Sequence, residues 1–116
     1  MTAAVLFVLV AAAGTIARAE INRWLNRPNG FPFGTLVVNV TGSFLLGLAA
    51  DIAPPALTVL GVGGLGAYTT FSGLAGDAIA LAARRRATSA ALYVAFSCVG
   101  GIAAAACGLA VSRSLS

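Results

Sequence analysis

The chain has 116 residues, of which 59% are hydrophobic and only 9% are charged, and its net charge of +4 comes from seven arginines against three acids. A typical soluble domain carries about 25% charged residues, and a domain of this size cannot hide so much apolar surface from water. These figures argue against a soluble enzyme, a nucleic-acid-binding domain and a disordered tail, which leaves an integral membrane protein.

Four apolar stretches follow one another along the chain, at about residues 2–17, 33–50, 55–83 and 88–111. A helix that crosses a bilayer needs roughly 17–25 residues. The first stretch lacks the basic start of a signal peptide, and we interpret it as a true span. The pattern predicts an all-α membrane protein, a single domain over residues 1–116 with four transmembrane helices.

Arginines gather in the connections between these stretches. Arg18, Arg23 and Arg27 lie in the first connection and Arg84, Arg85 and Arg86 form the third, whereas Arg113 follows the last stretch. Cytoplasmic loops are enriched in arginine. The pattern therefore predicts that both of these connections face the cytoplasm, that both termini lie outside, and that the chain has one fixed orientation. Arg18 could instead belong to a pore mouth.

The second stretch carries polar residues inside an apolar run. Thr35 and Asn39 are four positions apart and share one helix face. Polar side chains within a membrane are costly, so each needs a partner or a purpose. The two residues could line a path for a solute, or Asn39 could simply join helices by hydrogen bonds.

The third stretch is rich in glycine and then turns polar. Gly61, Gly63, Gly64 and Gly66 precede the run Ala67-Tyr68-Thr69-Thr70-Phe71-Ser72. The glycines match a dinucleotide-binding pattern, but that fold needs a preceding strand and a later acid. Because glycine weakens helices, we expect the third helix to break between Gly63 and Thr70. A broken helix frees carbonyls for a cation and amides for an anion. The alternative is a close-packed glycine seam between helices.

The fourth stretch adds Tyr93 and Ser97, again four positions apart. Together the last three stretches offer hydroxyls and one amide that could replace the hydration shell of a small anion. The electropositive edge of the Phe71 ring suits the same ligand, and Arg18 could raise the local anion concentration. Paired carboxylates and a nucleophile with a neighbouring base are missing from the sequence, so we expect no enzyme.

At these residues the sequence resembles the CrcB/Fluc family of fluoride channels. Gly34-Thr35-Leu36-Val37-Val38-Asn39 followed by Gly42-Ser43-Phe44 is similar to the family's second-span signature, and Gly63-Gly64 through Thr69-Thr70-Phe71-Ser72 is similar to its third. The resemblance implies a passive, fluoride-selective channel in the plasma membrane of a microbe. It also implies an antiparallel dimer with two pores, whose second subunit is a paralogue or a second copy.

The same resemblance assigns roles to individual residues. It implies that Thr35 and Asn39 line or support the pore, that the Phe71 ring faces fluoride, and that Ser72, Tyr93 and Ser97 complete the polar track. It places Arg18 at the vestibule. The carbonyls of Gly66 and Thr69 would hold a structural sodium ion on the dimer axis.

One departure weakens the match. Where the family continues with Thr-Phe and an acid three positions later, this chain has Gly73, Leu74 and then Asp77. Leucine lacks the electropositive ring edge, so a pore that depends on position 74 should conduct poorly unless the variant is tolerated. The incomplete motif and the arginine bias favour an oppositely oriented paralogue as partner.

Two alternatives remain open. A non-conducting structural subunit would explain Leu74. A small multidrug exporter would need a carboxylate in the middle of the first span, whereas Glu20, Asp51 and Asp77 flank the spans.

Overall fold

A computed structural model describes residues 2–26, 30–54 and 56–115. Arg27 and the predicted start of the third stretch at position 55 lie outside this part. The elements are α1 (Thr2–Leu25), α2 (Phe33–Leu48), the π-helical segment η1 (Thr58–Leu65), α3 (Gly66–Tyr68), α4 (Phe71–Ala83) and α5 (Ala87–Ser114). The described residues form no strand, and their one extended pairing is an isolated bridge between Asn26 and Pro32. The predicted all-α class is confirmed.

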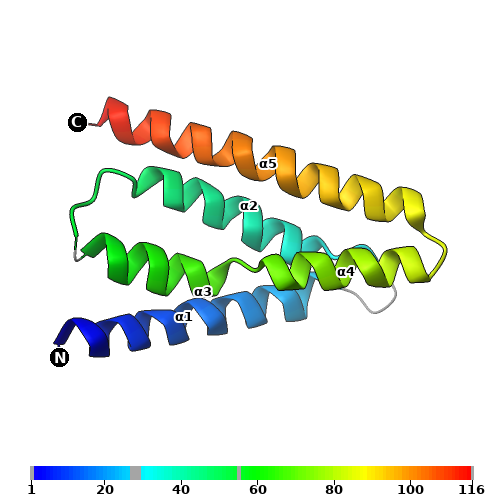
Figure 1. Ribbon diagram of the computed structural model, residues 1–116, viewed down its shortest axis with the longest axis horizontal. Helices are drawn as coiled ribbons and strands as arrows, with labels where there is room; N and C mark the ends of the chain where they lie inside the picture. Colours follow the sequence, from blue (N-terminus) through cyan, green and yellow to red (C-terminus); the bar gives the residue numbers. More distant parts are fainter. Residues whose placement is uncertain (1, 27–29, 55, 116) are drawn as a thin grey trace.

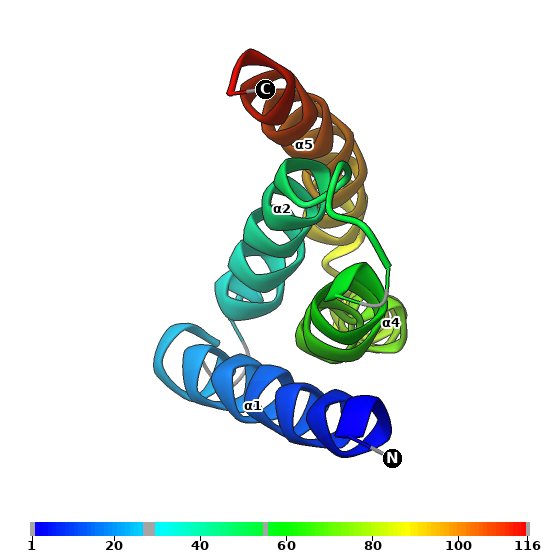
Figure 2. The same ribbon diagram turned by 90° about the vertical axis from the view of Figure 1, so that its left-hand side faces the viewer.

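The helices run side by side along the long axis of a molecule that measures 47 × 31 × 19 Å (Figure 1). Both termini lie at one end, whereas the turn from α4 to α5 lies at the other. Seen from the end, α2 lies between α1 and α5, and α4 lies to one side of this row (Figure 2). α2 packs mainly on α5, and α1 packs mainly on η1. Near the termini, the Ser112 hydroxyl donates to Asp51 Oδ2 at 3.1 Å.

Two helices, α1 and α5, are long and apolar enough to cross a membrane, and α2 is a shorter apolar helix. α1 continues beyond the first apolar stretch, past Ala17 and through Arg18 to Leu25. Arginine and glutamate are good helix formers, and Glu20 pairs with Arg23 one turn later at 3.6 Å. The arginines of this segment therefore extend the helix and do not begin the connection.

The break in the third helix lies at the end of the predicted window, beyond its glycines. The backbone stays helical through Tyr68, and Thr69 (φ −78°, ψ 159°) and Thr70 (φ −150°, ψ 112°) are extended before α4 begins. The glycines instead let α1 approach η1 closely. A Cβ atom at Gly63 would lie 3.1 Å from the Phe7 ring, and one at Gly64 would lie 2.6 Å from Val10 Cγ1. The alternative of a glycine seam therefore describes this segment better.

Glycines also set the distance between α2 and α5. A Cβ atom at Gly108 would collide with the carbonyl of Phe44 and lie 2.8 Å from the amide nitrogen of Leu48. A Cβ atom at Gly47 would likewise collide with the carbonyl of Ala105. Helices in membranes gain van der Waals contact when small residues let their backbones meet. This pair of glycines is therefore what allows the most extensive helix contact in the fold.

Two hydrogen bonds close the C-terminal end of α4, at the turn between α4 and α5. The Arg86 amide donates to the Leu81 carbonyl at 3.0 Å and the Arg85 amide to the Ala82 carbonyl at 3.1 Å. This is the Schellman arrangement, whose left-handed residue is usually glycine. Here that residue is Arg85, with φ 59°. A side chain in this conformation costs roughly 1–2 kcal/mol.

We predict that Gly108→Ala separates α2 from α5, because the new methyl group meets backbone atoms that have no free rotation. Overpacking of this kind lowers the free energy of unfolding by about 1–3 kcal/mol, which thermal unfolding of the detergent-solubilised protein would measure. Gly76→Ala is the matched control, because no atom lies within 4 Å of a Cβ atom at that position. Equal stability of the two variants would contradict the close contact.

Candidate functional site

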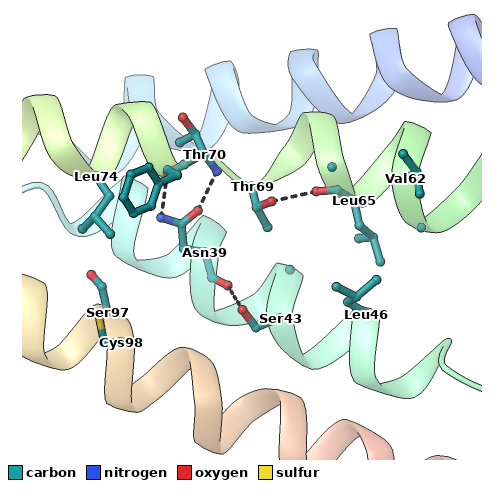
Figure 3. A pocket seen from close by; sticks show the side chains of 14 residues that line it. Asn39, Ser43, Leu46, Val62, Leu65, Thr69, Thr70, Leu74, Ser97 and Cys98 are labelled. Atoms are coloured by element: carbon teal, nitrogen blue, oxygen red, sulfur yellow. Dashed lines mark hydrogen bonds between the residues drawn. The ribbon is translucent and has the colours of Figure 1, made fainter.

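A groove of about 480 Å³ opens beside the break in the third helix. Its walls come from α2, from the end of η1, from the start of α4 and from one turn of α5 (Figure 3). Several residues that the sequence analysis singled out lie on these walls: Asn39, Gly66, Thr69, Phe71 and Ser97. Most of the remaining lining residues are apolar, among them Leu46, Val62, Leu65 and Leu74. The groove is therefore mainly apolar, with a few polar groups on its walls.

Asn39 joins α2 to the break by two hydrogen bonds. Its Oδ1 accepts from the Thr70 amide at 2.8 Å, and its Nδ2 donates to the Thr70 carbonyl at 3.1 Å (Figure 3). A continued α-helix would pair the Thr70 amide with the Gly66 carbonyl four residues earlier. Because the Thr70 amide donates to Asn39 instead, the Gly66 carbonyl does not receive this hydrogen bond. The side chain thus joins helices, as the structural alternative proposed, and it does so at the groove.

Thr70 also starts α4. Its Oγ1 accepts from the Gly73 amide at 2.9 Å, which is the hydrogen bond of a helix N-cap. In an uninterrupted helix the Gly73 amide would pair with the Thr69 carbonyl. The Ser72 hydroxyl lies 3.3 Å from Thr70 Oγ1 and is exposed. The carbonyls of Gly66 and Thr69 are therefore both relieved of their helical donors.

A second polar cluster lies in the core. Tyr93 is fully buried, and its hydroxyl donates to Asp77 Oδ2 at 3.2 Å. Thr35, 2% exposed, interacts with Tyr93 and accepts from Asn26 Nδ2 at 3.2 Å. The Tyr93 ring also meets Phe31 edge-on, with the ring centroids 5.4 Å apart. Thr35 and Tyr93 are brought together, but they do not line the groove.

Leu74 lies between the two clusters. It lines the groove (Figure 3) and also packs against the core formed by Leu81, Ala90 and Tyr93. The resemblance would place an aromatic ring at this position. The structure places an aliphatic side chain there, so one side of the groove wall lacks an electropositive ring edge.

Of the other predicted site residues, Phe71 and Ser97 line the groove and Arg18 does not. Phe71 begins α4, and its side chain is 82% exposed. Ser97 is 6% exposed, and its Oγ is buried without a hydrogen-bond partner among the described residues. Arg18 lies on α1, away from the lining of the groove. The pore roles of these residues stay predictions.

Three residues of these clusters were missed by sequence reasoning. Asn26 Oδ1 accepts from the amides of Gly34 at 2.7 Å and Thr35 at 3.3 Å, so it caps α2 from the end of α1. Because Asn26 is distant along the chain from the amides that it caps, no local sequence pattern indicated this contact. Thr70 could have been found as a threonine just before a helical run. Asp77 was expected beside a span but lies within α4, and a carboxylate on an apolar helix was itself the signal.

Comparison with known proteins gives a consistent result. The family described as "CrcB-like protein, Camphor Resistance (CrcB)" matches residues 5–109. A protein of Rhizobium johnstonii is 39% identical over 99% of both chains, and one of Rhizobium etli (strain CIAT 652) is 40% identical over the same shares. Both are named "Fluoride-specific ion channel FluC". "Fluoride-specific ion channel FluC 1" of Symbiobacterium thermophilum is 46% identical, with the match covering 59% of this chain and 63% of the other.

We predict that Asn39→Leu lowers the free energy of unfolding by about 1–3 kcal/mol, because the Thr70 amide is left without a partner in a partly buried place. Thermal unfolding in detergent, followed by circular dichroism, measures the loss. Ser43→Ala is the control. The Ser43 hydroxyl donates to the Asn39 carbonyl at 2.7 Å, within one helix, so its removal should change stability by less than about 0.5 kcal/mol. Similar losses in both variants would contradict the role given to Asn39.

Proposed function

Because the chain belongs to the CrcB-like family, we propose that it is a subunit of a fluoride-selective channel, which lets fluoride leave the cytoplasm down its gradient. The observation that carries this conclusion is the 39% identity, over 99% of both chains, with a relative named as a fluoride-specific ion channel. The protein is thus a membrane ion channel subunit and not an enzyme. Family membership also removes the reason to consider a multidrug exporter.

The finer membrane arrangement that we propose has four crossings. η1, α3 and α4 together form the third crossing, bent at Thr69 and Thr70. α2 is the short one, because its 16 residues extend only about 24 Å against a hydrocarbon core of about 30 Å. The arrangement is supported by the common end of the two termini (Figure 1). Arg84, Arg85 and Arg86 lie at the opposite end, which we assign to the cytoplasm of a microbial cell.

The second subunit in this proposal is antiparallel, and the pair encloses two pores. Support comes from the open side of the groove, whose lining includes two exposed apolar side chains, Phe71 (82% exposed) and Val62 (65% exposed). An aromatic side chain so exposed beside an apolar groove suits a protein contact. In the sequence, six arginines fall in the first and third connections and Arg113 follows the last apolar stretch, which favours a fixed orientation. The partner is therefore a paralogue, and a second copy is the alternative.

Fluoride would pass along the groove. A dehydrated anion needs donors and electropositive edges, and these are the groups that Ser97, Asn39 and the Phe71 ring would supply. Ser97 supports the path best, since its buried hydroxyl has no partner among the described residues. Ser72, Thr35 and Tyr93 would continue the polar track from the two neighbouring clusters. Arg18 would concentrate anions at the cytoplasmic mouth.

A structural sodium ion belongs to the same proposal. Hard cations such as sodium prefer oxygen ligands, and backbone carbonyls at broken helices supply them. The carbonyls of Gly66 and Thr69 suit this role because the Thr70 amide is bonded to Asn39 and the Gly73 amide to Thr70 Oγ1. The ion would neutralise the partial negative charge of these two carbonyls at the contact between subunits.

A non-conducting structural subunit is the second candidate, and Leu74 favours it. This side chain stands between the groove and the Tyr93 cluster. If the anion must pass an aromatic edge there, this chain alone would leave a gap in the track.

The decisive experiment is fluoride efflux from liposomes, read with a fluoride electrode. We expect efflux from liposomes that hold this chain together with its closest genomic paralogue, and little from the chain alone, because one orientation cannot form an antiparallel pair. Efflux from the chain alone would establish a homodimer and contradict the paralogue. If neither preparation conducts, the structural subunit becomes the better conclusion.

A matched pair of variants separates a silent pore from a missing partner. Leu74→Phe adds a ring on one side of the groove, and Val62→Phe adds the same ring at the opposite end (Figure 3). If Leu74 is the weak point of the pore, efflux of the mixed preparation rises in Leu74→Phe and not in Val62→Phe. Equal efflux in both variants and in the parent mixture would identify Leu74 as a tolerated residue.

Ser97→Ala should separate stability from conduction. The variant loses no hydrogen bond within the described residues, so its thermal midpoint should stay unchanged or rise. Efflux should fall by about tenfold or more, since a hydrogen bond to a charged group contributes about 1.5–3 kcal/mol. Cys98→Ala alters the neighbouring groove residue without removing a hydroxyl and should conduct like the parent. Undiminished efflux in Ser97→Ala would exclude Ser97 from the fluoride path.

A further inference from the structure

The turn between α4 and α5 carries three exposed arginines in a row, Arg84, Arg85 and Arg86. The middle one occupies the left-handed position of the Schellman turn, with φ 59°, where glycine would be the less strained residue. A residue kept in a strained conformation points to a use for its side chain. The question is what the Arg85 guanidinium binds.

The acids of the chain do not supply the answer. Of its three acids, Glu20 pairs with Arg23, Asp51 accepts from Ser112, and Asp77 accepts from Tyr93. Within the described part of the chain, Arg84 and Arg85 form no salt bridge. Three adjacent like charges repel one another, so the turn is more stable when an anion from outside the chain lies beside it.

We propose that the Arg84–Arg86 turn binds the phosphate headgroups of anionic phospholipids, an inference that rests on the membrane arrangement proposed above. α4 ends at Ala83 and α5 begins at Ala87, so the turn lies where two apolar helices leave the hydrocarbon core. Guanidinium groups bind phosphate oxygens with paired hydrogen bonds. Phosphates at that depth are those of the lipid headgroups, and each arginine near an anionic surface adds to the attraction.

Orientation of the chain in the membrane does not by itself require Arg85. A charge that served only to hold the turn in the cytoplasm could stand two or three residues later at Ala87 or Thr88, which are exposed and helical. Those positions carry no left-handed strain. The charge at position 85 therefore serves a local contact. The variant Arg85→Gly removes this contact and keeps the left-handed turn, because glycine adopts that conformation readily.

The test uses the full chain in detergent and follows its thermal midpoint as phosphatidylglycerol or phosphatidylcholine is added. We expect Arg85→Gly to unfold at a higher temperature than the parent without lipid, because the turn is relaxed. It should require about fivefold more phosphatidylglycerol for the same rise, which is the effect of one surface charge. Arg113→Ala removes the same charge at the opposite end and should respond to phosphatidylglycerol like the parent.

Several outcomes would overturn the proposal. One is an unchanged response of Arg85→Gly to phosphatidylglycerol, and another is an equal weakening in Arg113→Ala. A third is a parent midpoint that rises as much with inorganic phosphate, or with phosphatidylcholine, as with phosphatidylglycerol. Fluoride efflux from liposomes that hold the same variants together with the paralogue keeps the two proposals apart. Efflux without a lipid response removes only the headgroup site, and a lipid response without efflux removes only the channel.

Discussion

The two hydrogen bonds between the Asn39 side chain and the Thr70 backbone are the constraint on which the site depends. A break in a membrane helix is tolerated only where other protein groups satisfy the freed backbone. Asn39 supplies both a donor and an acceptor to one peptide residue, which an aliphatic side chain cannot do. The interruption before α4, the loss of a helical donor to the Gly66 carbonyl and part of the groove wall all involve this one contact.

The break also explains why the polar groups form two clusters and not one continuous line. α4 leaves the break and packs on α5, and this brings Asp77 to Tyr93 and fixes the Tyr93 hydroxyl in the core. Ser97 lies one helical turn further along α5 and faces the groove. Leu74 fills the space between them. Whether an anion can pass from one cluster to the other therefore depends on a single aliphatic position.

Much of the fold could be predicted from apolar run lengths, because α2 and α5 begin and end within a few residues of the stretches that predicted them. The break was predicted between Gly63 and Thr70 because glycine disfavours helix, and it lies at the end of that window because packing against Phe7 and Val10 outweighs the local preference at the glycines. The actual break depends on a contact between residues 31 positions apart. Asn26 was missed for the same reason, whereas family motifs located Asn39 and Ser97 without their contacts.

Within the described residues, several local features depart from a regular, fully paired helical fold. Thr69 and Thr70 interrupt a helix, the Ser97 hydroxyl is buried without a partner among the described residues, and Arg85 is left-handed. Each departure costs stability, and each leaves a polar group without its usual intramolecular partner: a carbonyl, a hydroxyl or a guanidinium. Proteins keep such departures mainly at functional sites. The ions that these groups attract differ in charge, because carbonyls attract a cation whereas the hydroxyl and the guanidinium attract anions. The proposed cation site at the break, the proposed anion path along the groove and the proposed lipid contact at the turn would therefore not compete for one ligand.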